Sequence, residues 1–291
     1  MTSFRLGDVS VSRVIEIGRS FYPTTAMLPD STADGIARHH HWLKPHFFDE
    51  STGDLRSVIQ SWIVRTPRHT VLIDTGVGNG KRREHAPLWN GRQGAYLDDL
   101  GAAGIRPEDV DLVLCTHLHV DHVGWNTRLV NGRWVPTFPR AAYVFVGEEF
   151  EFWKKESAAE REEWGCIDDS VLPIVDAGRA RLVESDHVID EWLRFEPLPG
   201  HTPGHACLRL STPAGDAVFC GDVMHRIVQV AEPQWSSQFC YDPGQARVTR
   251  RRFVDRHLDS GVLIVAAHFP TPGFIVKGDT GPQFRPAPAA V

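Results

Sequence analysis

The sequence predicts an α/β fold with two mixed β-sheets in the centre and helices outside them. Three features of the 291 residues predict it. Short apolar strands alternate with helical stretches, which favours parallel strands, and several strands follow one another closely, which favours antiparallel pairs. No repeat, low-complexity linker or break in composition divides the chain. We therefore expect a single domain over residues 1–291.

Most predicted elements of the first half are strands. In chain order they are strands over 9–17, 58–64 and 71–73, a helix over 93–103 and a strand over 110–115. The first strand is predicted by alternating apolar and polar residues, and the last by a β-branched, almost wholly apolar run. The turn Asp74-Thr-Gly76 follows the third strand, and Gly104 ends the helix.

The second half repeats this alternation. It contains predicted strands over 141–146, 194–198, 207–210, 217–220 and 262–267, and predicted helices over 148–163 and 243–258. Two segments fall outside the pattern. Residues 18–56 form an N-terminal extension without a recognisable motif, and residues 281–291 form a flexible tail, rich in proline and alanine, with no core to join.

The composition disfavours several classes of protein. The net charge is −6, from 31 Lys and Arg against 37 Asp and Glu, and an acidic surface repels nucleic acid. No apolar run approaches the ~18 residues of a membrane span, and the N-terminus lacks the apolar segment of a secretory signal. Five cysteines, an odd number without a CxxC pair, indicate a reducing compartment. We expect a soluble, cytoplasmic protein.

Histidines are the unusual feature of this chain, with 15 in all, about twice the number expected for an average sequence. Three of them and a carboxylate directly follow the strand over 110–115: His117, His119, Asp121 and His122. In an extended segment His117 and His119 point the same way, because side chains alternate with period two. Imidazole and carboxylate are good ligands for zinc and similar divalent ions. The cluster therefore predicts a metal site.

Three further residues of ligand type stand at the ends of apolar strands: His201, Asp222 and His268. Each alone is typical of a hydrogen-bonded structural residue. Strand ends at one edge of a sheet can nevertheless assemble a site from distant parts of the sequence. Together with His117 and its neighbours, these residues indicate such a site.

The order of these motifs resembles the metallo-β-lactamase superfamily. The matching segments are Asp-Thr-Gly (74–76), Thr-His-Leu-His-Val-Asp-His (116–122), Pro-Gly-His-Thr-Pro-Gly-His (199–205), Gly-Asp (221–222) and a late strand-end His268, over roughly residues 60–275. The resemblance implies an αβ/βα four-layer sandwich of two mixed β-sheets flanked by helices, with a two-metal site where the loops of the sheets meet.

The resemblance also implies which residues hold each ion. His117, His119 and His201 would bind one metal, Asp121, His122 and His268 the second, and Asp222 would bridge them. We expect two divalent ions, zinc first, although Mn, Fe or Co accept the same ligands. Such a pair can share a water as a bridging hydroxide at neutral pH. Asp74 would either orient a metal ligand by a hydrogen bond or have only a structural role in the turn. His205 would form structural hydrogen bonds.

Two positions indicate the branch of the family. Asp222 stands where β-lactamases of the best-known type carry Cys, which disfavours β-lactam hydrolysis. Asp121, where a redox di-iron relative would carry Glu, favours hydrolysis and is counted with the catalytic residues. His225 is similar to a histidine of methyl parathion hydrolases, where acyl-homoserine lactonases have Tyr. It would donate a proton or a hydrogen bond to the substrate, unless it is a buried structural histidine.

We therefore expect a dinuclear hydrolase that opens a lactone or cleaves an ester or aryl phosphoester. Aromatic residues near the motifs suggest an apolar or aromatic small-molecule substrate, with Trp125, Trp235 and Phe269 as pocket walls; the alternative is that they belong to the core. A homodimer would suit the family. The extension 18–56 would cover the site or form the dimer interface.

Other interpretations remain open. A mononuclear iron oxygenase of the persulfide dioxygenase type shares the fold, but would leave Asp121, His122 and His268 without a second metal. A metal-bound binding protein without activity is a third hypothesis. His39–His41 and His46 match no known site, and we expect them at the surface or in an interface. Residues 76–81 are not a phosphate loop, because Thr75 and Arg82 break the Walker pattern.

Overall fold

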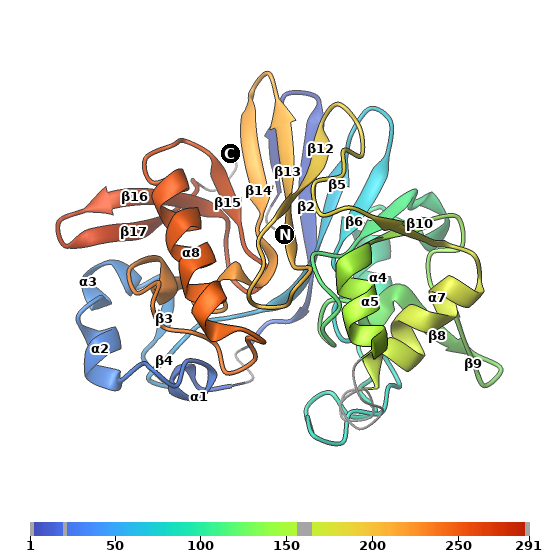
Figure 1. The fold of residues 1–291 in the computed structure, drawn as a ribbon, viewed down its shortest axis with the longest axis horizontal. Coiled ribbons are helices and arrows are strands. Elements are labelled where there is room, and N and C mark those ends of the chain that lie inside the picture. Colours follow the sequence, from blue (N-terminus) through green and yellow to red (C-terminus); the bar gives the residue numbers. More distant parts are fainter. Residues whose placement is uncertain (1–2, 20–21, 156–164, 289–291) are drawn as a thin grey trace. The chain divides into compact units, whose positions relative to one another are not determined.

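The computed structural model describes residues 3–19, 22–155 and 165–288. The chain forms two compact units. Unit 1 comprises Met1–Ile17 and Ile59–His187, and unit 2 comprises Gly18–Val58 and Val188–Val291. Each unit contains its own sheet and its own buried core, and Figure 1 labels most of their elements.

Unit 1 is built on a seven-stranded mixed sheet. Its strands, in their order across the sheet, are β1 (Phe4–Leu6), β2 (Val9–Ile17), β5 (Ile59–Arg65), β6 (Thr70–Ile73), β7 (Leu112–Leu114), β10 (Ala142–Val146) and β11 (Ala180–Val183). The pairs from β1 to β6 are antiparallel and those from β6 to β11 are parallel. The central strand β7 is buried throughout, as expected of a parallel strand covered on both faces.

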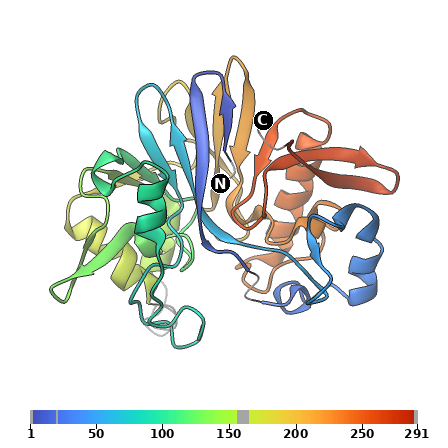
Figure 2. The same ribbon diagram turned by 180° about the vertical axis from the view of Figure 1, so that it is seen from behind.

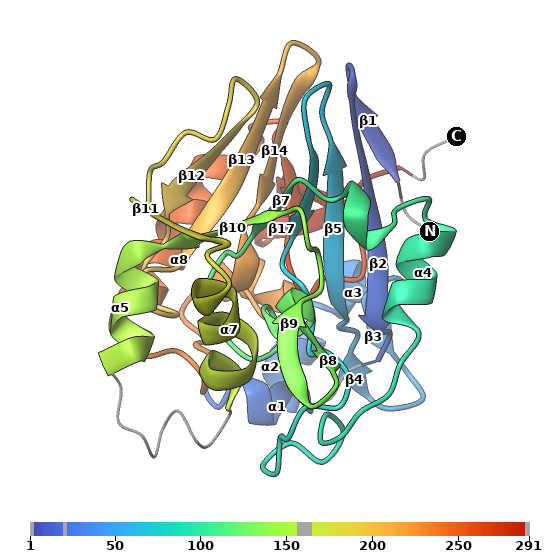
Figure 3. The same ribbon diagram turned by 90° about the vertical axis from the view of Figure 1, so that its right-hand side faces the viewer.

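Helices flank this sheet. They are α4 (Tyr96–Ala102), which packs against β2, α5 (Gly147–Lys155), which packs against β10 and β11, and α7 (Leu172–Asp176), preceded by a π-helical turn over Ile167–Val171. Figure 3 shows α4 beside β2. A hairpin of β8 (Thr127–Val130) and β9 (Arg133–Pro136) also belongs to this unit, as do short 3-10 turns over Pro107–Asp109 and Gly124–Asn126.

Unit 2 is built on a six-stranded sheet in sequence order: β12 (Leu193–Pro197), β13 (Ala206–Thr212), β14 (Gly215–Phe219), β15 (Leu263–Val265), β16 (Gly273–Gly278) and β17 (Gly281–Pro286). All neighbours are antiparallel except β14 and β15. The parallel step needs a crossover, and the long helix α8 (Pro243–His257) lies within it (Figure 2, orange-red). Asp242 caps α8 by accepting a hydrogen bond from the Gln245 N–H at 2.9 Å.

The extension 18–56 is part of unit 2. It forms α1 (Thr24–Met27), α2 (Ala33–Ala37), α3 (His40–Leu43) and the pair β3 (Phe48–Asp49) and β4 (Asp54–Leu55). Its Leu28, Leu43 and Phe47 are fully buried in the apolar core of the unit. Short 3-10 turns over Gly221–Val223 and Ile227–Val230 complete the unit.

The predicted strands and helices are present, with bounds shifted by one to three residues at most ends. The helix expected over 148–163 is seen as α5 up to Lys155, and residues 156–164 lie outside the described part. The prediction of a flexible tail is wrong for 281–286, which pair with β16 as β17. Phe284 supplies the core contact, because it is 2% exposed and packs edge-on against Phe269. The single domain stays a prediction.

Within the described residues, the helices are too short or too polar to span a membrane.

Candidate metal centre

Unit 1 carries the first group of candidate ligands on the loop after β7. β6 and β7 are parallel neighbours, with Ile73 opposite Leu114, so both strands end at the same edge of the sheet. The turn beginning at Asp74 and the loop beginning at Thr116 therefore start side by side. We call the ligand-type residues of this loop the His117 cluster: His117, His119, Asp121 and His122.

The carboxylate of Asp74 holds this loop. It accepts hydrogen bonds from the backbone N–H of Thr116 at 2.9 Å, from the Thr116 hydroxyl at 3.0 Å and from Nδ1 of His122 at 2.9 Å. Because a carboxylate only accepts, His122 carries its proton on Nδ1 and its lone pair on Nε2. The Thr116 hydroxyl also lies 3.1 Å from Nδ1 of His117. Asp74 thus fixes one imidazole directly and a second through Thr116.

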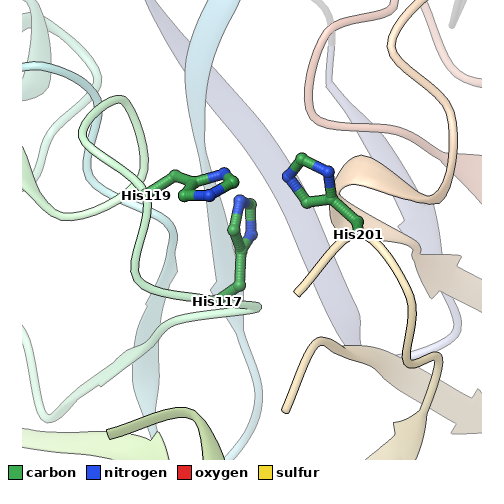
Figure 4. Close-up of side chains that lie close together, drawn as sticks. All are labelled: His117, His119 and His201. Atoms are coloured by element: carbon green, nitrogen blue, oxygen red, sulfur yellow. The ribbon is translucent and has the colours of Figure 1, made fainter. Parts of the chain in front are cut away.

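The imidazoles of the His117 cluster lie close to one another. The ring centres of His117 and His119 are 4.7 Å apart (Figure 4), and those of His117 and His122 are 4.0 Å apart. Oδ1 of Asp121 lies 3.7 Å from Nε2 of His122. His117 and His122 are buried, whereas His119 and Asp121 are partly exposed. The cluster is thus a compact set of nitrogen and oxygen donors.

A second buried carboxylate, which the sequence did not reveal, supports the same edge. Glu16, at the end of β2, accepts hydrogen bonds from the N–H of Val77 at 2.7 Å, the N–H of Gly78 at 3.2 Å and the indole N–H of Trp125 at 2.8 Å. Burial raises the pKa of Glu16, and these donors offset part of the rise. Gly76, at φ 61°, is needed here because a Cβ would overlap the Glu16 carboxylate. Glu16 therefore stabilises the backbone that follows the Asp-Thr-Gly turn by hydrogen bonds.

Unit 2 carries the second group of candidate ligands, again at strand ends. β14 and β15 are parallel, with Phe219 opposite Val265, so Asp222 and His268 follow strands that end at one edge. His201 lies on the loop between β12 and β13 (Figure 4). We call four residues the Asp222 cluster: His201, Asp222, His225 and His268.

Three imidazoles of this cluster surround the Asp222 carboxylate. Oδ2 lies 3.5 Å from Nε2 of His201 and 3.2 Å from Nε2 of His225, and both oxygens lie 3.2 Å from Nε2 of His268. All four residues are at most 2% exposed. A carboxylate and three imidazoles concentrated in so little buried space are costly to hold without a cation.

The outer nitrogens of two of these imidazoles, His268 and His201, contact the protein. Nδ1 of His268 donates to the carbonyl oxygen of Val58 at 2.9 Å, which leaves its Nε2 as the ligand atom. Nδ1 of His201 lies 3.6 Å from Sγ of Cys240. This arrangement, with one ring nitrogen held by the protein and the other turned toward a carboxylate, is typical of histidines that bind metals.

His205 has the structural role predicted for it. Its Nδ1 donates to the carbonyl oxygen of Leu198 at 3.0 Å, and its Nε2 accepts from the backbone N–H of Asp222 at 3.0 Å. With both nitrogens engaged in this way, His205 holds the backbone of Asp222 in place.

His225 contacts the Asp222 carboxylate, and its backbone N–H donates to Oε1 of Gln229 at 2.7 Å. Burial lowers the pKa of the His225 imidazole, while the Asp222 carboxylate acts in the opposite direction. Burial thus favours the neutral form of the ring, which has one N–H to donate. Its action on a substrate, predicted from the sequence, stays a prediction.

The three aromatic residues predicted to line a substrate pocket are buried. Trp125 is 4% exposed and stacks on Tyr96, with ring centres 5.0 Å apart. Trp235 and Phe269 belong to the apolar core of unit 2. The structure thus gives them the packing role that the sequence left as the alternative. Their contact with a substrate stays a prediction, which their burial does not favour.

Cysteines contribute no disulfide, as predicted. All five are free and buried: Cys115, Cys166, Cys207, Cys220 and Cys240. Burial raises the pKa of Cys115 and Cys220 well above the usual range, and that of Cys240 to about 11. No cysteine belongs to the metal-ligand groups found in the part of the chain that the structure describes.

Three histidines of the N-terminal extension contact residues outside the two clusters of candidate ligands. His39 lies 2.8 Å from Glu232, His41 contacts the carbonyl oxygen of Arg38, and the ring of His40 packs on Phe48. None of the metal-ligand groups found among the described residues includes them.

Both clusters fit a divalent metal ion by the chemistry of their donors. In unit 2, the ligand atoms of His201, Asp222 and His225 all lie within 4.8 Å of one another and are buried. In unit 1, three imidazoles and a carboxylate share one loop. Nitrogen and carboxylate donors without thiolates suit Zn²⁺ and the related Mn, Fe and Co ions.

Comparison with known proteins gives a family match. The Metallo-beta-lactamase superfamily matches residues 56–268. An N-acyl homoserine lactonase of a Bacillus species is 25% identical over 163 residues, which are 52% of this chain and 57% of the lactonase. The match thus spans little more than half the length of that relative.

Solved structures cover almost the whole chain. A hydrolase of the beta lactamase superfamily, AbOPH, has a TM-score of 0.80 at 27% identity and covers 98% of this chain and 97% of its own. AidC, a dizinc quorum-quenching lactonase solved with N-hexanoyl-L-homoserine, has a TM-score of 0.77 at 20% identity, covering 99% and 98%. The predicted fold class, mixed β-sheets flanked by helices as in this superfamily, is confirmed.

Proposed function

Because the chain belongs to the metallo-β-lactamase superfamily, we propose that it is a dinuclear metal-dependent hydrolase that opens a lactone or cleaves an ester or aryl phosphoester. The observation that carries the proposal is the Asp222 carboxylate, which is surrounded by three buried imidazoles. Nε2 of His201 and of His225 lie beside Oδ2, and Nε2 of His268 lies 3.2 Å from both oxygens. A carboxylate offered on both oxygens is suited to bridging two cations.

The ligands proposed for the two ions come from both clusters. His117, His119 and His201 would hold one ion, Asp121, His122 and His268 the other, and Asp222 both. This division is supported by the order of the family motifs in the sequence. It is also supported by the outer-nitrogen contacts of His122 and His268, which leave Nε2 of each ring as the ligand atom.

The ions, when bound, would supply a water-derived nucleophile at neutral pH and polarise the oxygen of the substrate. The protein's own part is to hold the ligands. Asp74 fixes His122 directly and His117 through Thr116. His205 fixes the backbone of Asp222, and the neutral His225 offers an N–H to the substrate's oxygen as the bond breaks.

The substrate class is proposed from the relatives. Several Bacillus relatives are named N-acyl homoserine lactonases, whereas one from Thermus thermophilus is named a ribonuclease. The structure of AidC contains the product N-hexanoyl-L-homoserine, which favours the lactone. A lactone is an internal ester, so its opening needs the same attack on a carbonyl carbon as ester cleavage. Zinc is the proposed ion, and a homodimer in the cytoplasm is the proposed form of the enzyme.

Proton release in a pH-stat tests the proposal. Purified protein with a full complement of metal would receive an N-acyl homoserine lactone, an aryl ester and a methyl phosphotriester in separate runs. We expect acid release from at least one, abolished by a chelator and restored by Zn²⁺. One iron per chain with oxygen uptake on a persulfide, and no acid release, would instead indicate the oxygenase alternative.

A further inference from the structure

Glu149 is a buried carboxylate in α5, a helix that also carries exposed charged residues. It lies in the first turn of α5, where its neighbour Glu148 is exposed, yet Glu149 itself is only 1% exposed. Removing a carboxylate from water is costly unless strong hydrogen bonds replace the lost hydration. The partners of Glu149 therefore indicate what its burial achieves.

Two hydrogen-bond donors to Glu149 lie next to one candidate ligand, His119. Its Oε1 accepts from the backbone N–H of Leu118 at 3.1 Å and from the indole N–H of Trp153 at 2.7 Å. Leu118 lies between His117 and His119 in the ligand loop. Holding its N–H fixes the backbone from which these two imidazoles point.

Trp153 links Glu149 to the side chain of His119. It follows Glu149 by four residues on α5, so the two side chains are neighbours on one helix face. Its ring packs edge-on against the ring of His119, with centres 5.3 Å apart and an angle of 66°. His119 is partly exposed, whereas His117 is buried and is also held by the Thr116 hydroxyl, so the contact with Trp153 is important for the His119 ring.

We propose that Glu149 is a positioning residue for His119, acting through the Leu118 N–H on the backbone and through Trp153 on the ring. The proposal rests on the proposed function only in taking His119 as a metal ligand. In this proposal α5 contributes no ligand itself but holds the ring of His119 in the orientation needed to bind the metal. Loosened ligands of this kind typically weaken metal binding by about 10- to 100-fold.

Two substitutions at Glu149 separate its hydrogen bonds from its charge. Glu149→Gln keeps an acceptor oxygen for both donors, whereas Glu149→Met keeps similar volume without one. Glu151→Gln is the control, because its half-exposed carboxylate on the same helix lies 3.8 Å from Lys154 and away from the loop. Trp153→Phe keeps a ring against His119 but loses the donor to Glu149.

The readouts are the Zn²⁺ dissociation constant from chelator competition, the visible spectrum of the Co²⁺-substituted protein, and the Tm of the metal-free protein as a test of folding. We expect Glu149→Met to bind Zn²⁺ about 10- to 100-fold more weakly with an altered Co²⁺ spectrum. Glu149→Gln and Glu151→Gln should match the wild type in both, and Trp153→Phe should fall between.

Several results would overturn the proposal. If Glu149→Met folds and keeps the wild-type Zn²⁺ affinity and Co²⁺ spectrum, Glu149 does not position His119. If Glu149→Gln loses as much Zn²⁺ affinity as Glu149→Met, the charge of Glu149 matters rather than its hydrogen bonds. If Glu149→Met fails to fold, an unchanged Co²⁺ spectrum in Trp153→Phe overturns it. A wild-type protein that binds no metal contradicts the proposed function as well, which distinguishes the two failures.

Discussion

Asp74 accepts a hydrogen bond from Nδ1 of His122 at 2.9 Å, and this contact determines which nitrogen of His122 can bind a metal. The carboxylate requires a proton on Nδ1 and so leaves Nε2 with its lone pair. Asp74 has φ 54°, in the left-handed region that aspartate and asparagine tolerate better than most residues. The sequence left open whether Asp74 orients a ligand or serves only its turn, and this contact favours the first.

We therefore expect Asp74→Asn to preserve the turn conformation but to weaken binding of the ion held by His122. An asparagine amide that donates to Nδ1 would move the His122 proton to Nε2 and block the ligand atom. We expect the affinity for the ion bound by His122 to fall by about 10- to 100-fold, with metal content dropping from two ions per chain toward one. Asp109→Asn, an exposed carboxylate of the same unit, is the control. Two tightly bound ions in Asp74→Asn would contradict this role.

His225→Ala tests the predicted catalytic role of this histidine. If its N–H acts on the substrate, kcat/KM should fall by about 100-fold or more while both ions remain bound. Metal content must be measured beside the kinetics, because His225 lies against the Asp222 carboxylate. Unchanged kcat/KM with both ions retained would remove His225 from the mechanism.

Gly200→Ala should destabilise unit 2 next to His201. Gly200 has φ 128°, and a Cβ there would overlap the backbone of Ala246 in α8. Backbone strain alone costs about 1–3 kcal/mol, and neither backbone can move cheaply. We expect the free energy of unfolding to fall by at least ~2 kcal/mol, with weaker metal binding. Gly53→Ala is the matched control, with φ 68° and open space around the new Cβ, at a cost of about 1 kcal/mol.

Equal losses of unfolding free energy in the two glycine variants, measured by urea denaturation, would show that crowding at Ala246 is unimportant.

The buried Lys81 makes the free energy of unfolding depend on pH. It is fully buried, donates to the Thr127 hydroxyl at 2.8 Å and to the carbonyl oxygen of Asp169 at 3.2 Å, and lies 3.8 Å from the ring centre of Trp134. Burial lowers the pKa of Lys81 from 10.5 to about 8. Between these pH values the folded protein has lost this proton and the unfolded chain still holds it. Lys81 therefore makes the free energy of unfolding rise with pH across this window.

Lys81→Met removes that contribution. We expect the difference in unfolding free energy, wild type minus variant, to increase by about 2–3 kcal/mol from pH 7.5 to pH 10. The cysteines and tyrosines of the unfolded chain titrate in the same range, but they are common to both proteins and cancel in the difference. A difference that stays constant between the two pH values would contradict the lowered pKa.

Strands with strong patterns could be predicted from the sequence. β2 alternates apolar and polar residues, and β7 is a short apolar run, so periodicity alone identified both. β17 was missed because Pro282 and Pro286 stand at positions that disfavour a strand. It forms as the last strand of its sheet, where proline is tolerated, and it is held by the single buried side chain of Phe284.

The ligand-type residues could be predicted because histidines and aspartates at strand ends are rare and costly. The residues that hold them could not. Glu16 and Glu149 belong to segments with ordinary polar patterns, and only the three-dimensional contacts show that their carboxylates are buried. Trp125 was assigned to a pocket from its position after His122, but its neighbours in space are Tyr96 and Glu16.

The most direct test of the account is a metal titration of the enzyme itself. Metal-free protein would receive Zn²⁺ in steps while acid release from N-hexanoyl homoserine lactone, or from whichever substrate the pH-stat identifies, is followed. We expect activity to rise until two equivalents are bound per chain, and His268→Ala to bind about one equivalent and to be inactive. Full activity at one equivalent, or in the metal-free protein, would contradict the dinuclear hydrolase proposed here.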